Sequence, residues 1–164
     1  MITVSDTSPI HYLILLRQEE ILPKLFGQII IPVPVAVEMR HPKAPIKVRE
    51  WIASPPDWVS IQKPKHEYVP KASGLGKGEI AVIAIAIEEN ADAVLMDDRA
   101  AIREGRMSDL TVLTTFAVIE LAAIENLIDF EEMLNKLVET TFRMPPDYVV
   151  NEYLRRNSER KSPF

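Results

Sequence analysis

The chain has 164 residues, of which 47% are hydrophobic, and it carries no cysteine. This length supports one domain with a substantial core, and the lack of cysteine excludes a disulfide-stapled scaffold, a Cys-ligated zinc or iron–sulfur site and a cysteine nucleophile. A formal net charge of −5, from 19 Lys and Arg against 24 Asp and Glu, argues at first against a nucleic-acid partner, because phosphate binding depends on cations.

The charge is unevenly distributed along the chain. Residues 38–78 carry eight Lys or Arg against four Asp or Glu, a net +4, whereas residues 79–142 carry four against fourteen, a net −10. The acidity is therefore local, and a basic segment remains that is able to contact phosphates. The N-terminus shows no basic leader, and no apolar run reaches the roughly 18 to 20 residues that span a bilayer. We therefore expect a cytoplasmic protein with no membrane contact.

Short β-branched runs alternate with helical stretches along the chain. Ser8 followed by Pro9 predicts an N-cap and a first helical position. The predicted elements follow as strand 2–4, helices 9–17 and 21–26, strand 28–31, helices 35–40 and 47–53, strand 58–61, helix 79–87, strand 93–96, helix 99–106, strand 111–113 and helices 115–123, 130–139 and 146–156.

This alternation predicts βαβ units with right-handed crossovers around a parallel sheet. The stretch Ile80–Ile87 is apolar on every face, which indicates a helix that is buried all round. Residues 62–73 are rich in Pro and Lys and are expected to form a loop. We expect one domain over residues 1–156, followed by a disordered tail over residues 157–164.

Acidic residues follow the predicted strands. Asp6 ends the first strand, Glu38 lies in the helix after the second, Glu79 opens the buried helix, and Asp97 and Asp98 end the strand that this helix precedes. Sites of open α/β sheets lie beyond the carboxyl ends of the strands, so these acids are expected to converge. Crowded carboxylates require a cation or shared protons. Oxygen ligands without cysteine favour Mg²⁺ or Mn²⁺.

Each acid taken alone also has a structural interpretation. Asp6 fits turn chemistry, Glu38 fits a solvated helix charge, and Glu79 complements a helix dipole. The pair Asp97-Asp98 fits a helix cap. The glycines of the segment 74–78 match neither the dinucleotide fingerprint nor the P-loop spacing. Only the combination of acids therefore predicts a catalytic site.

Several short motifs also occur in a fixed order: Ser5-Asp6-Thr7-Ser8-Pro9, Leu22–Gly27, Ile31–Glu38, Gly76-Lys77-Gly78-Glu79, Val94–Arg99 and Thr141–Met144. In this order they resemble the PIN-domain nucleases over nearly the whole chain, and more narrowly the VapC-like toxin subgroup. The resemblance implies a three-layer α/β/α sandwich with a central, mainly parallel sheet of four to five strands. It also implies hydrolysis of RNA phosphodiesters that depends on Mg²⁺ or Mn²⁺.

The resemblance assigns roles by position. Asp6, Glu38 and Glu79 correspond to the first three acids of the metal-binding and catalytic set. The usual Thr-x-Asp ending of the later strand favours Asp98 as the fourth, with Asp97 as an alternative ligand. Water near the ion is expected to be oriented by Thr7, Ser8 and Thr115. RNA phosphates are expected to be contacted by Arg40, Lys63, Lys65, Lys71, Lys77 and Arg99.

We therefore predict a metal-dependent endoribonuclease, the toxin of a type II toxin–antitoxin pair, that forms a homodimer and binds a cognate antitoxin protein. Three positions depart from the subgroup, where Ile102 replaces an Arg and Thr114 and Ala117 each replace a Gly. These departures leave open a weakened module that only binds RNA or an antitoxin. A structure-specific DNA nuclease is a further alternative, because nothing in the sequence recognises a 2′-hydroxyl.

Overall fold

The computed structural model describes residues 1–162. In it the chain divides into two compact units, the first ending at Thr115 and the second beginning at Phe116. The acids singled out by the sequence all belong to the first unit. Within the described residues, no helix is both long and apolar enough to cross a bilayer.

A five-stranded parallel sheet forms the centre of the first unit. Its strands are β1 (Ile2–Ser5), β2 (Gln28–Pro32), β3 (Val59–Gln62), β4 (Ala93–Leu95) and β5 (Val112–Leu113). They lie in the order β3-β2-β1-β4-β5, and every neighbouring pair is parallel. The predicted α/β fold with a mainly parallel sheet of four to five strands is therefore confirmed.

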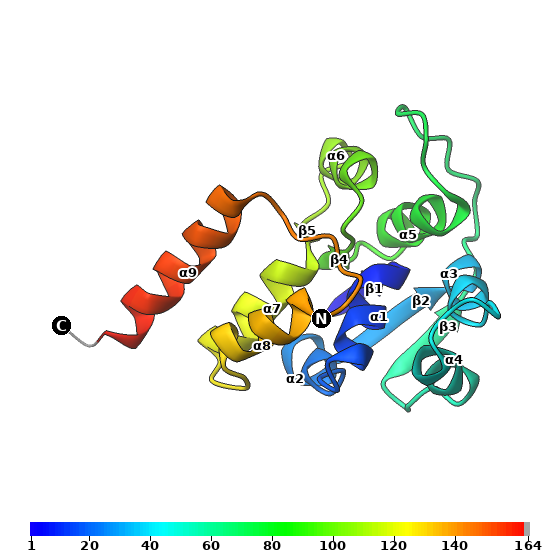
Figure 1. Ribbon diagram of the computed structural model, residues 1–164. Coiled ribbons are helices and arrows are strands. Elements are labelled where there is room, and N and C mark those ends of the chain that lie inside the picture. Colours follow the sequence, from blue (N-terminus) through cyan, green and yellow to red (C-terminus); the bar gives the residue numbers. More distant parts are fainter. Residues whose placement is uncertain (163–164) are drawn as a thin grey trace. The chain divides into compact units, whose positions relative to one another are not determined.

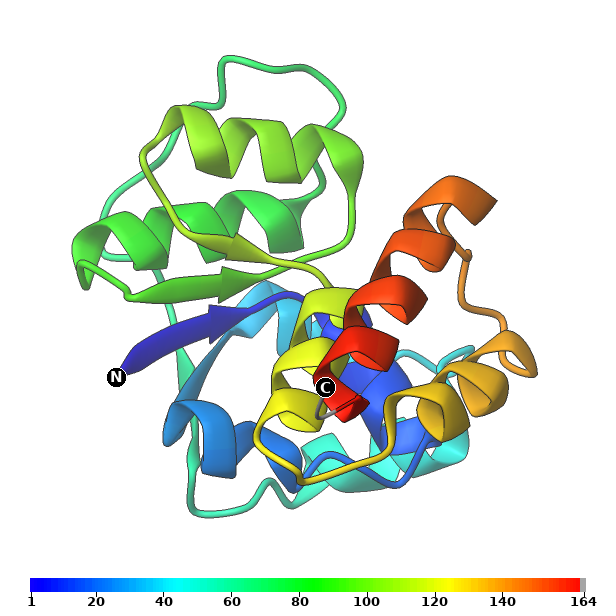
Figure 2. The ribbon, with the colours of Figure 1, turned by 90° about the vertical axis from the view of Figure 1, so that its left-hand side faces the viewer.

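Helices cover both faces of this sheet. They are α1 (Thr7–Leu15), α2 (Ile21–Phe26), α3 (Val33–Met39), α4 (Ile46–Ala53), α5 (Lys77–Glu88) and α6 (Arg99–Met107). From β1 the chain moves outward to β2 and β3, and then returns to the other side of β1 to form β4 and β5. Because crossovers between parallel strands are right-handed, this reversal places the helices before and after β3 on opposite faces of the sheet. Figures 1 and 2 show α1, α2 and α4 on one side of the strands and α5 and α6 on the other.

Burial in the core explains why β2 and α5 are continuous apolar runs in the sequence. Ile29, Ile30 and Ile31 of β2 are all buried, as expected for a strand covered on both faces. Residues 81–86 of α5 are buried without interruption, as predicted for a helix surrounded by protein. The prediction for Ile80–Ile87 is wrong at its end, because Ile87 is exposed, and Ile80 is only partly buried. The site described below is thus built on rigid elements.

The second unit contains α7 (Thr115–Ile124), which begins at the boundary residue, α8 (Phe130–Val138) and α9 (Asp147–Lys161). Phe116 packs edge-on against Phe130 and Tyr153, with ring centroids 6.5 and 5.3 Å away. Arg156 lies 4.4 Å over the Tyr153 ring and donates to both carboxylate oxygens of Glu120, at 2.8 and 2.9 Å. Aromatic packing and one bidentate ion pair therefore hold these helices together.

Helix α9 continues to Lys161, whereas the sequence pattern predicts its end at residue 156. Asn157 is buried, and Lys161 Nζ lies 2.7 Å from Asp129 Oδ2. These contacts join segments about thirty residues apart and are invisible to local periodicity. The predicted disorder falls partly on residues 163–164, which lie outside the described residues, and the single domain over residues 1–156 stays a prediction.

Candidate functional site

The predicted acids lie where the order of the sheet reverses. β1 is flanked by β2, the next strand in the chain, and by β4, the strand to which the chain returns. Such a switch point is the usual position of sites in open parallel sheets. Asp6 directly follows β1, and its main-chain N–H donates to Leu95 O of β4 at 2.9 Å. Asp97 and Asp98 follow β4, so the three acids share this edge of the sheet.

Gly78 brings the acids of α3 and α5 toward Asp6. A Cβ atom placed on Gly78 would lie 3.0 Å from Glu38 Oε1 and 3.4 Å from Asp6 Oδ1. The two carboxylates therefore face the same small space above the first turn of α5. Glu79 follows in that turn, but its carboxylate lies beside Gly76, so the position above Gly78 is bordered by two acids and by Val35.

Asp6 is the most perturbed acid of the site. Its side chain is 7% exposed, and its pKa is raised to about 7. Burial is the largest cause, opposed by the hydrogen bond from the Thr7 amide, and the charges of Glu79, Glu38 and Asp97 raise the pKa further. Although Asp6 is the N-cap residue of α1, its side chain makes no capping bond. The buried carboxyl group thus costs stability and does not stabilise the helix.

Glu79 belongs to the same electrostatic cluster. Burial is the main cause that raises its pKa, against a hydrogen bond from the Gly76 amide, and the charges of Asp98 and Glu38 add to the rise. Within residues 1–162, none of the five acids forms an ion pair with a Lys, Arg or His. The five carboxylates therefore repel one another without a protein counter-ion.

Hydroxyl groups of α1 bind two of these acids. The Thr7 hydroxyl donates to Glu38 Oε2 and the Ser8 hydroxyl to Asp97 Oδ2, each at 2.6 Å. The prediction that Ser8 caps the first helix is wrong, because α1 already begins at Thr7 with Asp6 in the capping position. Two capping-type residues lie two positions apart, and local sequence does not choose between them. Ser8 instead links α1 to the end of β4.

Asp97 and Asp98 have different surroundings. Asp97 Oδ1 accepts from the Thr115 amide at 2.8 Å, and its Oδ2 accepts from the hydroxyls of Thr115 and Ser8. Asp98 is exposed and caps α6, with its Oδ1 accepting from the Ala101 amide at 2.9 Å. Asp97 is therefore occupied by internal donors on both oxygens, whereas the Oδ2 atom of Asp98 has no such donor in the described part of the chain.

The predicted phosphate-binding residues fall into two groups. Arg40, Lys77 and Arg99 lie within two residues of Glu38, Glu79 and Asp98, and all three cations are exposed. Neither they nor Lys63 form an ion pair with any described residue. Lys65 Nζ lies 3.4 Å from Glu89, and the main-chain N–H of Lys71 donates to Glu104 at 2.8 Å.

Glu104 is a buried acid that the sequence analysis missed. Its carboxylate accepts from the Tyr68 hydroxyl at 2.6 Å and from the amides of Lys71 and Ala72 at 2.8 and 2.9 Å. These bonds, the Tyr68 bond foremost, hold the pKa of Glu104 below its usual range. One feature of the sequence could have indicated its burial: Glu104 lies on the same side of α6 as the small residues Ala101 and Gly105, which are buried. Glu104 thus attaches the loop before α5 to α6.

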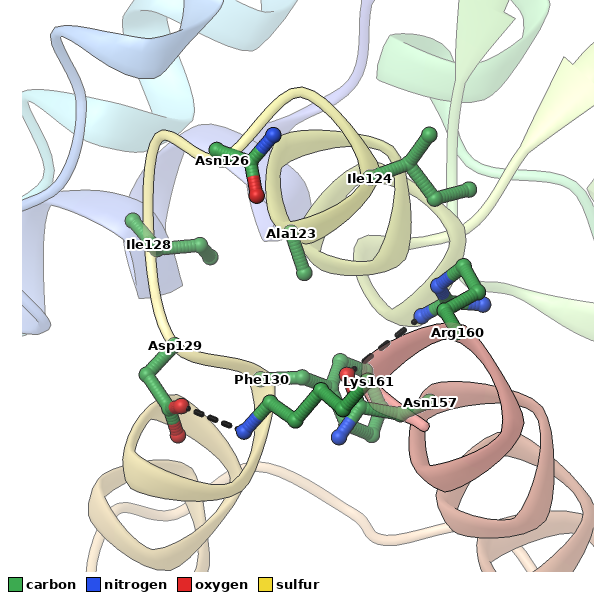
Figure 3. A pocket seen from close by; sticks show the side chains of 9 residues that line it. All are labelled: Ala123, Ile124, Asn126, Ile128, Asp129, Phe130, Asn157, Arg160 and Lys161. Carbon is green, nitrogen blue, oxygen red and sulfur yellow. Dashed lines mark hydrogen bonds and ion pairs between the residues drawn. The ribbon is translucent and has the colours of Figure 1, made fainter. Parts of the chain in front are cut away.

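In residues 1–162, no group of three or more His, Asp or Glu side chains is arranged so that it could hold a metal ion as the side chains lie in this structure. The acids contact internal donors instead, as described above. A separate pocket of about 510 Å³ lies within the second unit (Figure 3). It contains none of the predicted site residues and is lined by Ala123, Ile124, Asn126, Ile128, Asp129, Phe130, Asn157, Arg160 and Lys161.

Comparison with known proteins agrees with this architecture. The family model described as PIN domain (DUF3368) matches residues 2–159. This chain belongs to the PIN-domain family. PIN domains are generally nucleases and usually use divalent metals, so the acidic edge of the sheet lies in a nuclease-type fold. The predicted resemblance to this family is confirmed.

One solved structure supports the same PIN fold. It is a PilT N-terminus domain protein, SSO1118, from the hyperthermophilic archaeon Sulfolobus solfataricus P2, with 16% sequence identity and a TM-score of 0.50. The match covers 88% of this chain and 100% of that chain. At this identity the likeness concerns the fold alone. A search of the curated proteins finds no match.

Proposed function

We propose that this PIN-domain protein is an endoribonuclease that depends on Mg²⁺ or Mn²⁺ and acts on RNA in the cytoplasm. The observation that carries the proposal is the cluster around Asp6, in which buried and half-buried carboxylates lie together without a protein cation. Such an arrangement costs folding free energy, and a bound divalent cation would offset that cost.

The chemistry of the donor set suits a hard divalent cation, although the side chains as they lie form no group of three that could hold one. Its members are carboxylates, the ligands that Mg²⁺ and Mn²⁺ prefer. The space above Gly78, which a Cβ atom would fill, is bordered by Glu38 and Asp6 oxygens. We assign Asp6, Glu38, Glu79 and Asp98 to the ion. When bound, such an ion supplies a hydrolytic nucleophile at neutral pH and stabilises charge on the leaving oxygen.

The remaining residues hold these acids and the substrate. Thr7 orients Glu38 through its 2.6 Å hydrogen bond. Asp97 joins Ser8 and Thr115 and thereby fixes the end of β4 that carries Asp98. We infer that Asp97 is a positioning residue, because both of its oxygens are occupied. The exposed cations Arg40, Lys77 and Arg99 flank the acids and are suited to contact phosphates.

The two adjacent aspartates provide a direct test. We expect Asp98→Asn to abolish cleavage with a stability change below about 0.5 kcal/mol, since Asn caps helices as well as Asp does. Asp97→Asn should cost about 1–3 kcal/mol of stability, because an amide cannot accept all three internal donors. Urea unfolding and RNA cleavage assays measure the two effects. Loss of cleavage in Asp97→Asn with normal activity in Asp98→Asn would reverse the assignment.

Metal removal tests the proposed activity itself. We expect the protein to cleave labelled single-stranded RNA in Mg²⁺, and EDTA to slow cleavage by about a thousandfold, reversed when Mg²⁺ is restored in excess. Single-stranded DNA and flapped duplexes serve as parallel substrates. Cleavage of DNA alone would favour the DNA-nuclease alternative, and RNA binding without cleavage would favour the binding module. Cleavage that resists EDTA would contradict metal dependence.

A toxin role, a cognate antitoxin and a homodimer belong to the same proposal. They rest on the resemblance to the VapC-like subgroup, through motifs such as Ser5-Asp6-Thr7-Ser8-Pro9. The departures at Ile102, Thr114 and Ala117 lie outside the five acids, so they leave the proposed ligand set complete.

A further inference from the structure

Helix α6 carries three arginines along one face. Arg99, Arg103 and Arg106 are four and three residues apart, which places them within about 60° around the helix axis. All three are exposed. The opposite face holds Ala101, Glu104 and Gly105, which are buried. We call the three side chains the α6 arginine stripe; it runs for about 10 Å along the helix.

The stripe is not neutralised. None of its guanidinium groups forms an ion pair or a side-chain hydrogen bond with any residue of the described part. Helix α9 is the contrast within this chain, since its three arginines all pair with Glu side chains: Arg155 with Glu152 and Glu159, and Arg156 and Arg160 with Glu120. The arginines of α9 are thus neutralised by acids of this chain, whereas those of α6 are not.

Sequence composition makes the stripe more distinct. Residues 79–142 contain fourteen Asp or Glu and only four Lys or Arg. Three of those four cations form the stripe, and the fourth is Lys136. The positive charge of an otherwise acidic segment is therefore concentrated on one face of one helix.

Glu104 is the acid within α6 itself and directly follows Arg103, yet it lies on the buried side of the helix. Its carboxylate is buried and binds the Tyr68 hydroxyl and the amides of Lys71 and Ala72. Glu104 thus fixes α6 against the preceding loop from its buried side. At the same time it leaves the exposed side without negative charge.

The stripe begins at the acidic site. Arg99 directly follows Asp98, and Arg103 and Arg106 lie successively farther along α6. Guanidinium groups bind phosphate oxygens in a bidentate manner, and about 10 Å corresponds to about three stacked nucleotides of one strand. We propose that the α6 arginine stripe binds the phosphodiester backbone of single-stranded nucleic acid where the strand leaves the acidic site. The position of the scissile phosphate rests on the proposed function, but the binding surface does not.

The test is a binding measurement with cleavage switched off. Fluorescence anisotropy with a labelled oligouridine compares Asp6→Asn with the same chain carrying Arg103→Gln and Arg106→Gln. Both arginines are exposed and Gln is a good helix former, so the fold is retained. We expect binding to weaken about tenfold and the slope of log affinity against log salt to fall by about 1.4. The matched control, Lys24→Gln with Lys136→Gln, removes two exposed charges from α2 and α8 and should leave both quantities near their starting values.

The outcomes separate this proposal from the nuclease assignment. Unchanged binding in the arginine variant, or an equal loss in the lysine control, would overturn the stripe. A matched oligodeoxynucleotide should weaken in parallel, because phosphates are common to RNA and DNA, and an effect confined to RNA would also overturn it. If the unmodified protein cleaves neither RNA nor DNA but the stripe effect persists, the nuclease function fails and the binding surface stands.

Discussion

Replacing Asp6 by Asn is expected to abolish cleavage and, at the same time, to stabilise the metal-free protein at pH 8. Burial raises the pKa of Asp6 from 3.8 to about 7. Between these two values the folded protein keeps a proton that the unfolded chain has lost, so the stability of the metal-free protein falls as pH rises. Above pH 7 the cost is complete, at up to about 4 kcal/mol. Asn carries no charge and avoids it.

Unfolding by urea in EDTA at pH 4, 6 and 8 measures this effect. We expect the two proteins to be similar at pH 4 and the Asn variant to become progressively more stable toward pH 8. Mg²⁺ should stabilise the unmodified protein and not the variant. Asp57→Asn, which removes an exposed acid, is the control and should leave the pH dependence unchanged.

Activity gives the second half of the same result. Loss of Asp6 should slow RNA cleavage by about a thousandfold or more. Induced expression of the unmodified chain should also arrest growth, and the variant should not, if the protein is a toxin. A variant that is less stable at pH 8 would show that Asp6 serves the fold, and full cleavage by a folded variant would refute its place in the site.

The sequence predicts the sheet and the convergence of acids well because both follow from local signals. β-branched runs, Pro and Gly mark the elements, and parallel topology brings the strand ends together. Ile29, Ile30 and Ile31 read as a buried strand without any tertiary information. Asp6 and Glu38 meet for the same reason, because they follow neighbouring parallel strands.

Other features depend on contacts between distant residues and cannot be read from the pattern. Asp97 and Asp98 are adjacent in sequence, yet only Asp97 is occupied on both oxygens, by donors 89 and 18 residues away. From the sequence alone, Glu104 would be interpreted as a solvated helix charge. In the fold, the loop at residues 68–72 donates hydrogen bonds to its carboxylate. Tertiary hydrogen bonds, not helix or strand propensity, therefore distinguish Asp97 and Glu104, whose carboxylates accept donors on both oxygens, from Asp98, which accepts on one.

Gly78→Ala is expected to separate helix stability from site geometry. In a helix, Ala is favoured over Gly by about 1 kcal/mol, so propensity alone predicts a more stable protein. The new Cβ atom would lie 3.0 Å from Glu38 Oε1 and 3.4 Å from Asp6 Oδ1, and it would also crowd Val35. The acids must move apart by a few tenths of an ångström. A 1 Å misplacement at a reacting centre costs about a hundredfold in rate, so we expect a smaller loss here.

Gly105→Ala is the matched control, because it also adds a methyl group inside a helix. Its Cβ atom would lie 3.0 Å from Val112 Cγ2, and none of the five acids is among the nearest atoms. We expect Gly105→Ala to lose stability through overpacking, about 1–3 kcal/mol, and to keep its cleavage rate per folded molecule. Gly78→Ala should show the reverse, a stability close to that of the unmodified chain and a cleavage rate that is lower by up to about a hundredfold. Equal losses of rate in both variants would mean that the methyl group at residue 78 acts through general destabilisation, because only at residue 78 does it occupy the space between the carboxylates.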